Sequence, residues 1–134
     1  MAGSPVTDDR LSAVLGKSRR RLALYYLLSN EYTDIDSLSV QLAAWERDES
    51  VTSVDEAARR QVKISLHHNH LPRLEQHGVL EFDVRSGDVV RAPGFEDLRP
   101  AVERLRATDE KLDRLRNDRA VSGDVDGEQF AFTR

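Results

Sequence analysis

Apolar positions in the first half of the chain recur at helical spacing. Residues 18–28 hold strong helix formers and are apolar nearly all round, which predicts a central, largely buried helix. A second helix is predicted over residues 36–46, where one face carries Leu38, Leu42 and Trp45. The remaining residues of this half are more polar, and we expect a flexible segment at 1–16 and loops at 30–36 and 48–53.

Capping residues indicate where the second and third helices begin. Asp34 or Asp36 stands where an N-cap of the second helix is needed. Ser53 is followed three residues later by Glu56, which is the capping-box pattern and predicts the start of a long third helix.

The third helix contains an internal proline. An apolar stripe runs through it at Ile64, Leu71 and Leu74. Pro72 removes one backbone hydrogen bond and crowds the carbonyl of His68, so a kink near His68 is expected. Because the stripe keeps its phase, the pattern favours a bent continuous helix over two separate ones. Gly78 supplies the left-handed stop.

Beyond Gly78 the apolar spacing changes from helical to alternating. Residues 79–84 and 89–91 predict two strands joined by a short turn at 85–88, which makes a β-hairpin. A charged helix is predicted over residues 94–117, with a narrow apolar seam at Leu98, Val102, Leu105 and Leu112. The seam favours dimerisation, although a helix packed on its own domain fits almost as well. Residues 118–134 are rich in Gly and Asp, and we expect a disordered tail.

Length and composition restrict the class of protein. A chain of 134 residues predicts one main domain, at residues 17–93, and the fold class is mainly α with a small β-hairpin (α+β). The chain has no cysteine, which excludes disulfides and thiolate chemistry. It shows no signal peptide and no apolar run that could span a membrane, so a cytoplasmic protein is expected. Motifs for phosphate loops, nucleophile elbows and zinc hydrolases are missing, so we expect no enzyme and assign no cofactor.

Charged residues are unevenly distributed. Arg accounts for 17 of the 20 basic residues and Asp outnumbers Glu by 14 to 10, which favours a halophilic source. Net charge is −4, yet residues 59–73 contain four bases and no acid. Within this stretch the side opposite the apolar stripe carries hydrogen-bonding groups, at Gln61, Ser65, Asn69 and Arg73. The segment therefore offers a partner a face free of carboxylates.

The order of three helices, a hairpin and a further helix is similar to the winged helix-turn-helix superfamily. More closely, His67-His68-Asn69-His70-Leu71-Pro72-Arg73-Leu74 and Gly78-Val79-Leu80-Glu81-Phe82-Asp83 resemble small haloarchaeal winged-helix proteins of unknown function. The resemblance covers residues 17–93. It implies a winged-helix fold and a transcription-regulator role. One departure is the helix connection, where 48–53 and an extension through Arg60 replace the usual tight turn.

With double-stranded DNA as the expected partner, the third helix would enter the major groove. The residues expected to reach base edges are Ser65, His68, Asn69 and Arg73. Those expected to neutralise phosphates are Arg59, Arg60 and Lys63, with Arg85 at the hairpin tip on the backbone or in the minor groove. A homodimer would match a palindromic site.

Other interpretations remain open at this point. The same face would also suit a winged-helix adaptor that binds protein and not DNA. His67, His70 and His77 fall within one arc that could hold a metal ion, but a partly buried His67 explains the pattern better, and we assign no metal site. The triplet Arg19–Arg21 either touches phosphate or stays solvated, and its place at a helix start is a small indication of a partner.

Overall fold

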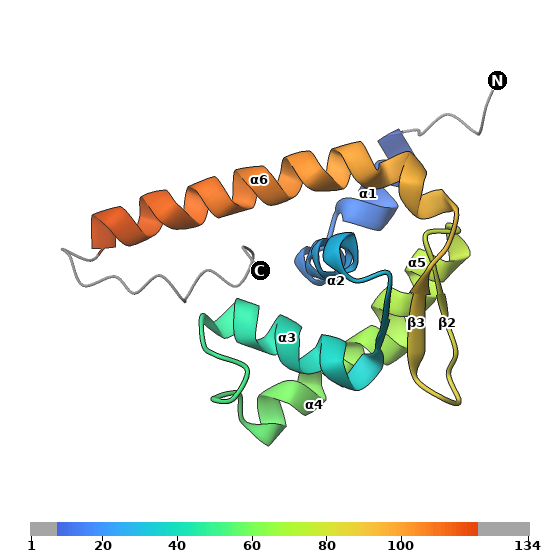
Figure 1. The fold of residues 1–134 in the computed structure, drawn as a ribbon, viewed down its shortest axis with the longest axis horizontal. Coiled ribbons are helices and arrows are strands. Elements are labelled where there is room, and N and C mark those ends of the chain that lie inside the picture. Colours follow the sequence, from blue (N-terminus) through green and yellow to red (C-terminus); the bar gives the residue numbers. More distant parts are fainter. Residues whose placement is uncertain (1–7, 121–134) are drawn as a thin grey trace.

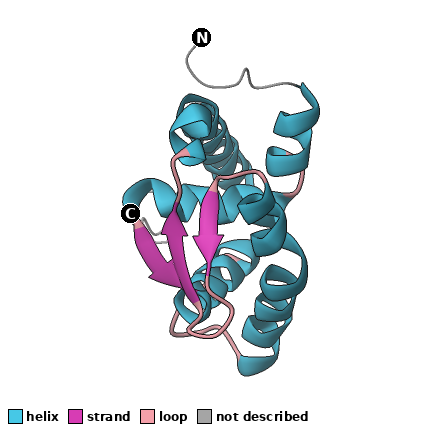
Figure 2. Cartoon of the chain, turned by 90° about the vertical axis from the view of Figure 1, so that its right-hand side faces the viewer, coloured by secondary structure: helices cyan, strands magenta, loops and turns pink. Residues whose placement is uncertain are grey.

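Helices make up most of the protein, and three short strands form one small sheet (Figures 1 and 2). The computed structural model describes residues 8–120. Its elements in chain order are α1 (Asp8–Leu15), α2 (Ser18–Ser29), β1 (Tyr32–Asp34), α3 (Ile35–Arg47), α4 (Glu56–Ser65), a π-helical turn η1 (Leu66–His70), α5 (Leu71–Gln76), β2 (Leu80–Phe82), β3 (Asp88–Arg91) and α6 (Gly94–Ala120). The predicted mainly helical α+β class is confirmed.

The strands pair antiparallel in the order β1–β3–β2. The predicted hairpin is formed by β2 and β3, with Phe82 opposite Val89. On its other side β1 joins the sheet through the pairing of Thr33 with Val89. The prediction of a loop over residues 30–36 is therefore wrong at Tyr32–Asp34. Only Thr33 of this strand is buried, so the sequence lacks the apolar alternation that marks a strand.

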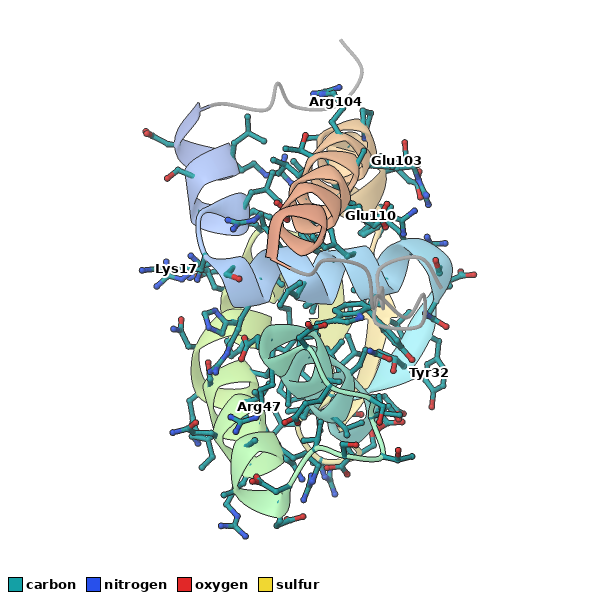
Figure 3. The ribbon with its side chains drawn as sticks, turned by 90° about the vertical axis from the view of Figure 1, so that its left-hand side faces the viewer. Lys17, Tyr32, Arg47, Glu103, Arg104 and Glu110 are labelled. Atoms are coloured by element: carbon teal, nitrogen blue, oxygen red, sulfur yellow. The ribbon has the colours of Figure 1, made fainter. Side chains whose placement is uncertain are left out.

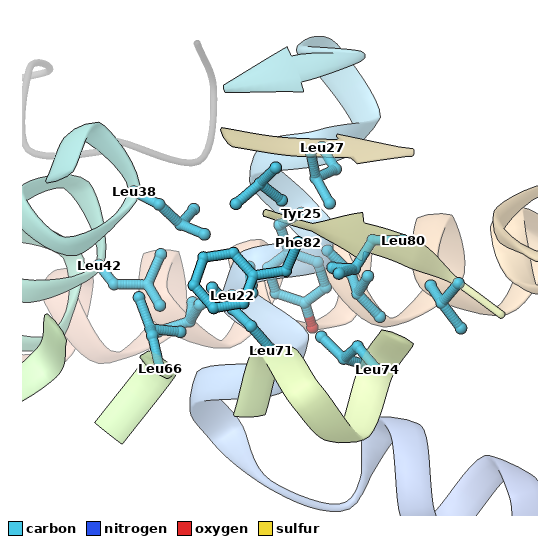
Figure 4. Packing of buried hydrophobic residues seen from close by; sticks show 14 of the residues in the cluster. Leu22, Tyr25, Leu27, Leu38, Leu42, Leu66, Leu71, Leu74, Leu80 and Phe82 are labelled. Carbon is cyan, nitrogen blue, oxygen red and sulfur yellow. The ribbon is translucent and has the colours of Figure 1, made fainter. Parts of the chain in front are cut away.

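The hydrophobic core lies between α2, α3 and the continuous helical unit α4–η1–α5, with side chains of β2 closing one side (Figure 4). The large side chains that are almost fully buried there include Leu24, Tyr25, Leu27, Leu38, Leu42, Leu66, Leu71, Leu74 and Leu80. Burial of each such side chain stabilises the fold by roughly 1.5–3 kcal/mol relative to exposure. The helical unit is thus held firmly along its inner side, which fixes what its outer side presents.

The third helix is continuous through its proline. Pro72 lies in the first turn of α5, where it has no N–H to offer the carbonyl of His68. The chain widens just before it into the π turn, and the Leu71 N–H donates to the carbonyl of Leu66, five residues earlier. The predicted continuous helix is confirmed, and the predicted distortion near His68 takes the form of this π turn.

The π turn changes which side chains the helix buries. Leu66 and Leu71 are five residues apart and both fully buried, and Val62 is buried one turn before Leu66. Ile64 is 53% exposed. The prediction that Ile64 shares the buried stripe is therefore wrong, because the π turn adds one residue and shifts the phase of the helix.

Carboxylates cap both helices that precede this turn. The Asp34 carboxylate accepts a hydrogen bond of 2.8 Å from the Ser37 N–H, which confirms Asp34 as the cap of α3. At the start of α4 the Asp55 carboxylate accepts from the Ala58 N–H at 2.8 Å. The capping box predicted at Ser53 is wrong, because Asp55 is closer to the first turn and takes that role.

The N-terminal part of the chain contains a helix that the sequence did not predict. Residues 8–15 form α1, and Val14 and Leu15 are buried against the core. The flexible segment predicted at residues 1–16 is wrong for this helix, because two adjacent apolar side chains are enough to dock it. Residues 1–7 lie outside the described part of the chain.

The last helix packs on its own domain, where it crosses beside α1 and α2 (Figure 1). Leu98 and Val102, half of the predicted dimerisation seam, are 1% and 0% exposed within one chain. They are therefore not available to a second copy. Because α6 runs to Ala120, the disorder predicted from residue 118 is wrong for residues 118–120, and the rest of that tail lies outside the described residues. Within residues 8–120, no helix combines the length and apolar character needed to cross a bilayer.

Candidate nucleic-acid interface

The outer side of α4–η1–α5 is the surface that carries most of the predicted DNA contacts. Its exposed residues between positions 59 and 73 are Arg60, Gln61, Ile64, His68, Asn69, Pro72 and Arg73. None of them is acidic, and we call this row the polar face. Ser65 is half-buried beside it. Because the inner side of the helix is fixed by core leucines, the polar face is held in one orientation.

Two of the expected phosphate-binding cations are already paired within the chain. Lys63 Nζ lies 2.7 Å from Asp36, and Arg59 Nη2 lies 2.5 Å from Glu56. The hydrogen bond from Lys63 lowers the pKa of Asp36, and the hydrogen bond from Arg59 lowers the pKa of Glu56. Both carboxylates stay charged at neutral pH, so a phosphate would have to displace them. That Arg59 and Lys63 neutralise phosphates stays a prediction, and it now requires that a phosphate displace these two carboxylates.

Arg60 is the cation of this group that remains available. Its guanidinium touches Glu56 only at 3.8 Å, and its side chain is 62% exposed. An exposed pair at that distance contributes little. The start of the helical unit therefore offers one free arginine instead of the three expected cations.

The middle of the helical unit brings His68 and Asn69 together. With Arg73 they line an open pocket that Glu75 and Gln76 complete on the C-terminal side. Asn69 carries both a donor and an acceptor, and His68 has a ring nitrogen free for either role. This part of the polar face can form directional hydrogen bonds to a partner.

The two outlying arginines are not brought together. Arg73 belongs to α5, which lies beside the base of the hairpin, whereas Arg85 belongs to the β2–β3 turn at the opposite end, toward α4 (Figure 1). Neither guanidinium forms an ion pair with another described residue. Seven of the eight predicted residues therefore lie along the helical unit between positions 59 and 73, while Arg85 stands apart at the hairpin turn, and the eight do not form one compact cluster.

The hairpin itself is acidic. A second open pocket is lined by Glu75, Glu81, Phe82, Asp83, Asp88 and Val90. Asp83 is partly occupied in the turn, where its carboxylate accepts from the backbone N–H of Arg85 at 2.9 Å. The hairpin thus presents one arginine at its turn and carboxylates along its side.

The histidines of the π turn have different surroundings. The ring of His67 packs edge-on against Phe82 with 5.6 Å between centroids, which confirms His67 as partly buried. The single hydrogen-bond partner also expected for it is wrong within the described residues, because its buried Nδ1 has none. His70 is 6% exposed and its Nδ1 lies 3.4 Å from Arg20 Nη1. Among the described residues, no three metal-binding side chains converge at one point.

Burial and the charges around it keep His70 neutral. Burial first, and then the positive charges of Arg20 and Arg19, lower the pKa of His70 to about 4. Its unprotonated Nδ1 can therefore accept a hydrogen bond from Arg20 at neutral pH. One pattern in the sequence indicates this buried arginine. Arg20 shares a helical face with Ala23, Leu24 and Leu27, all fully buried.

Residues 12–90 match the family described as Domain of unknown function (DUF7344). No curated protein and no solved structure matches the chain.

Proposed function

Since the chain belongs to the DUF7344 family, whose description states no activity, we propose from the geometry that it is a cytoplasmic DNA-binding transcription regulator. In this proposal α3 and α4–η1–α5 act as a helix-turn-helix pair, and the β2–β3 hairpin acts as a wing. The polar face enters the major groove, which admits one α-helix.

The observation that carries the proposal is the polar face, in a protein with 24 acidic residues and a net charge of −4. Surface carboxylates repel the phosphates of DNA, so a duplex can approach most easily along this row, which Glu75 borders at its C-terminal end. The face consists mainly of arginine, amide and imidazole groups, which form the usual hydrogen bonds to base edges and phosphates.

The structure supports a division of roles along this face. Asn69 suits a bidentate contact to adenine, and His68 and Ser65 lie close to it on the same helix. Arg60 would contact a phosphate at one end, and Arg85 at the hairpin turn would contact a second phosphate or the minor groove. Arg73, at the base of the hairpin, would contribute at the margin of the interface.

The pairing of Arg59 and Lys63 within the chain suits a protein that binds DNA at high salt concentration. Affinity from phosphate contacts falls steeply as the salt concentration rises. A protein with few free cations must then take its affinity from base contacts and from shape. The Asp-rich and Arg-rich composition supports a salt-loving archaeal source for such a protein.

A homodimer is the assembly that we propose for reading a palindromic site. Because Leu98 and Val102 are buried within one chain, contacts between copies would have to use other residues.

A protein-binding adaptor is the second candidate. Ile64 is 53% exposed within the polar face and Val84 is 61% exposed at the hairpin turn. Exposed branched apolar side chains beside an acidic hairpin suit a protein surface with basic groups. In that case the hairpin and Ile64 would bind the partner, and His68 and Asn69 would be dispensable.

Genomic-DNA selection with purified protein at high potassium chloride tests the proposal. The wild type is compared with a His68→Ala/Asn69→Ala variant and with Arg104→Ala, a control that removes an exposed arginine of α6, far from the polar face (Figure 3). We expect the wild type and the control to recover one palindromic motif that the double variant loses. Absence of enrichment at every salt concentration, with folded protein, would reject DNA binding and favour the adaptor.

A further inference from the structure

Arg20 is a buried cation with no carboxylate partner among the described residues. It lies in the first turn of α2, and the residue is 5% exposed. Its Nε is buried and has no hydrogen-bond partner. Arginine is almost never buried without a counter-charge, because removal of a guanidinium from water is costly unless an anion compensates it.

The hydrogen bond to His70 leaves one edge of the guanidinium unused. Nη1 points to His70 Nδ1, which is a neutral acceptor and provides no negative charge. The remaining edge consists of Nε and Nη2, whose N–H groups are parallel. A pair of parallel donors on a planar cation fits two oxygens of one phosphate or carboxylate.

Two further cations lie near Arg20 and its partner His70. Arg73 is exposed and lies close enough that its charge, after burial, lowers the pKa of Arg20. Lys17, at the α1–α2 corner next to the helical unit, is also exposed (Figure 3). Neither Arg73 nor Lys17 has an ion-pair partner among the described residues. Their long side chains can move without disturbing the core.

Glu46, a carboxylate whose charge acts on His70, is already bound to another cation. Glu46 accepts from Arg19 Nε at 2.6 Å and from Arg19 Nη2 at 3.0 Å. This bidentate pair cancels the charges of Glu46 and Arg19 and leaves Lys17, Arg20 and Arg73 uncompensated. The corner between α2 and the helical unit thus has an excess of positive charge in an acidic protein.

We propose that Arg20, Arg73 and Lys17 form a binding site for a phosphate group, with the Nε and Nη2 edge of Arg20 as its centre. Arg20 gives two parallel hydrogen bonds, and Arg73 and Lys17 close over the anion from the solvent side. The site is separate from the β2–β3 turn, and it does not depend on DNA being the partner of the polar face.

The phosphate group can come from a free oxyanion or from a DNA backbone. Titration of the full chain with potassium phosphate, at constant ionic strength in potassium chloride, tests the first source by the shift of the Arg20 Nε–H signal in NMR spectra. Titration with duplex DNA in place of phosphate tests the second. A downfield shift of this signal with one titrant identifies that titrant as the source of the phosphate group. If neither titrant shifts the signal, the proposal is overturned.

Variants separate this site from a general salt effect. Arg20→Met keeps most of the apolar volume and removes a buried charge, so we expect a folded protein of unchanged or higher thermal stability. We expect it to bind phosphate about tenfold more weakly than wild type, because a charge-assisted bidentate pair is lost. Arg104→Met, which removes an exposed arginine of α6 outside the polar face, is the matched control and should bind phosphate as the wild type does.

Equal phosphate binding by Arg20→Met and wild type would overturn the proposal. If Arg20→Met does not fold, Arg73→Gln at the surface of the site replaces it. Weaker phosphate binding by Arg73→Gln than by Arg104→Met supports the site, and equal binding overturns it.

Discussion

The hydroxyl of Tyr25 donates a hydrogen bond of 2.5 Å to the carboxylate of Asp109, which joins two helices across 84 positions of the chain. Tyr25 lies in α2 within the core, and Asp109 lies in the second half of α6. Burial first, and then the hydrogen bond to Asp109, raise the pKa of Tyr25, so the hydroxyl keeps the proton that it donates. The contact holds α6 along the domain well beyond its buried first turns.

Tyr25→Phe should therefore lower the free energy of unfolding by about 1–2 kcal/mol, because a half-buried carboxylate loses its donor. Urea unfolding followed by circular dichroism measures this. The control is Tyr26→Phe, since the hydroxyl of Tyr26 makes no hydrogen bond with the described residues. Equal losses in the two variants would show that the contact with Asp109 contributes nothing.

Val102→Ala should lower the free energy of unfolding of the single chain. It should not affect contacts between copies. The side chain is 0% exposed within one protomer, and truncation of such a residue costs about 2 kcal/mol. We expect the same loss at low and high protein concentration in urea unfolding. A loss that disappears as the concentration rises would place Val102 in an interface between copies. The exposed neighbour Glu103→Ala is the control.

Two glycines near the base of the hairpin should differ in their tolerance of a methyl group. A Cβ on Gly94 would lie 2.4 Å from the backbone oxygen of Gly78, so the chain would have to move. Gly78 has φ +75° but open space around its Cβ position, so Gly78→Ala should cost only the left-handed penalty of about 1–2 kcal/mol. We therefore expect a much lower melting temperature for Gly94→Ala than for Gly78→Ala. The reverse order would contradict the close approach of the two backbones.

Stability should fall in mild acid because of His70. Its pKa is about 4 in the folded protein against 6.5 ordinarily, so between these values the unfolded chain binds a proton that the folded chain does not. The stability that the protein has because His70 is neutral is fully present above pH 6.5 and is lost as the pH falls toward 4. The shift corresponds to roughly 3 kcal/mol.

Unfolding free energies measured from pH 7 to pH 4 test this for wild type and His70→Gln. The variant should lose less stability than wild type over that range. His68→Gln, at an exposed position, should follow the wild-type curve. Parallel curves for wild type and His70→Gln would contradict the buried, neutral histidine.

The helices and the hairpin could be predicted because their signals are local. Leu38 and Leu42 mark the buried face of α3 by their spacing, and Gly78 has the left-handed conformation expected of a helix stop. The π turn could not be predicted, because a single added residue leaves no mark in an apolar pattern. Leu66 and Leu71 share a face only after that residue is counted.

The candidate site was predicted less well than the fold, since its electrostatics depend on distant residues. Asp36 lies 23 positions before Arg59, and nothing in the sequence shows that it also pairs with Lys63. The same limit applies to Arg20, which meets His70 across 50 positions. Sequence patterns identify which side chains are charged, but pairing requires the folded chain.

Ultraviolet crosslinking of the protein to fragmented genomic DNA, with the crosslinked peptides identified by mass spectrometry, tests the central claim most directly. We expect crosslinks in residues 60–69 and at the β2–β3 turn, and loss of the first set in the His68→Ala/Asn69→Ala variant. Crosslinks confined to α1 or α6, or none from folded protein at any salt concentration, would contradict it.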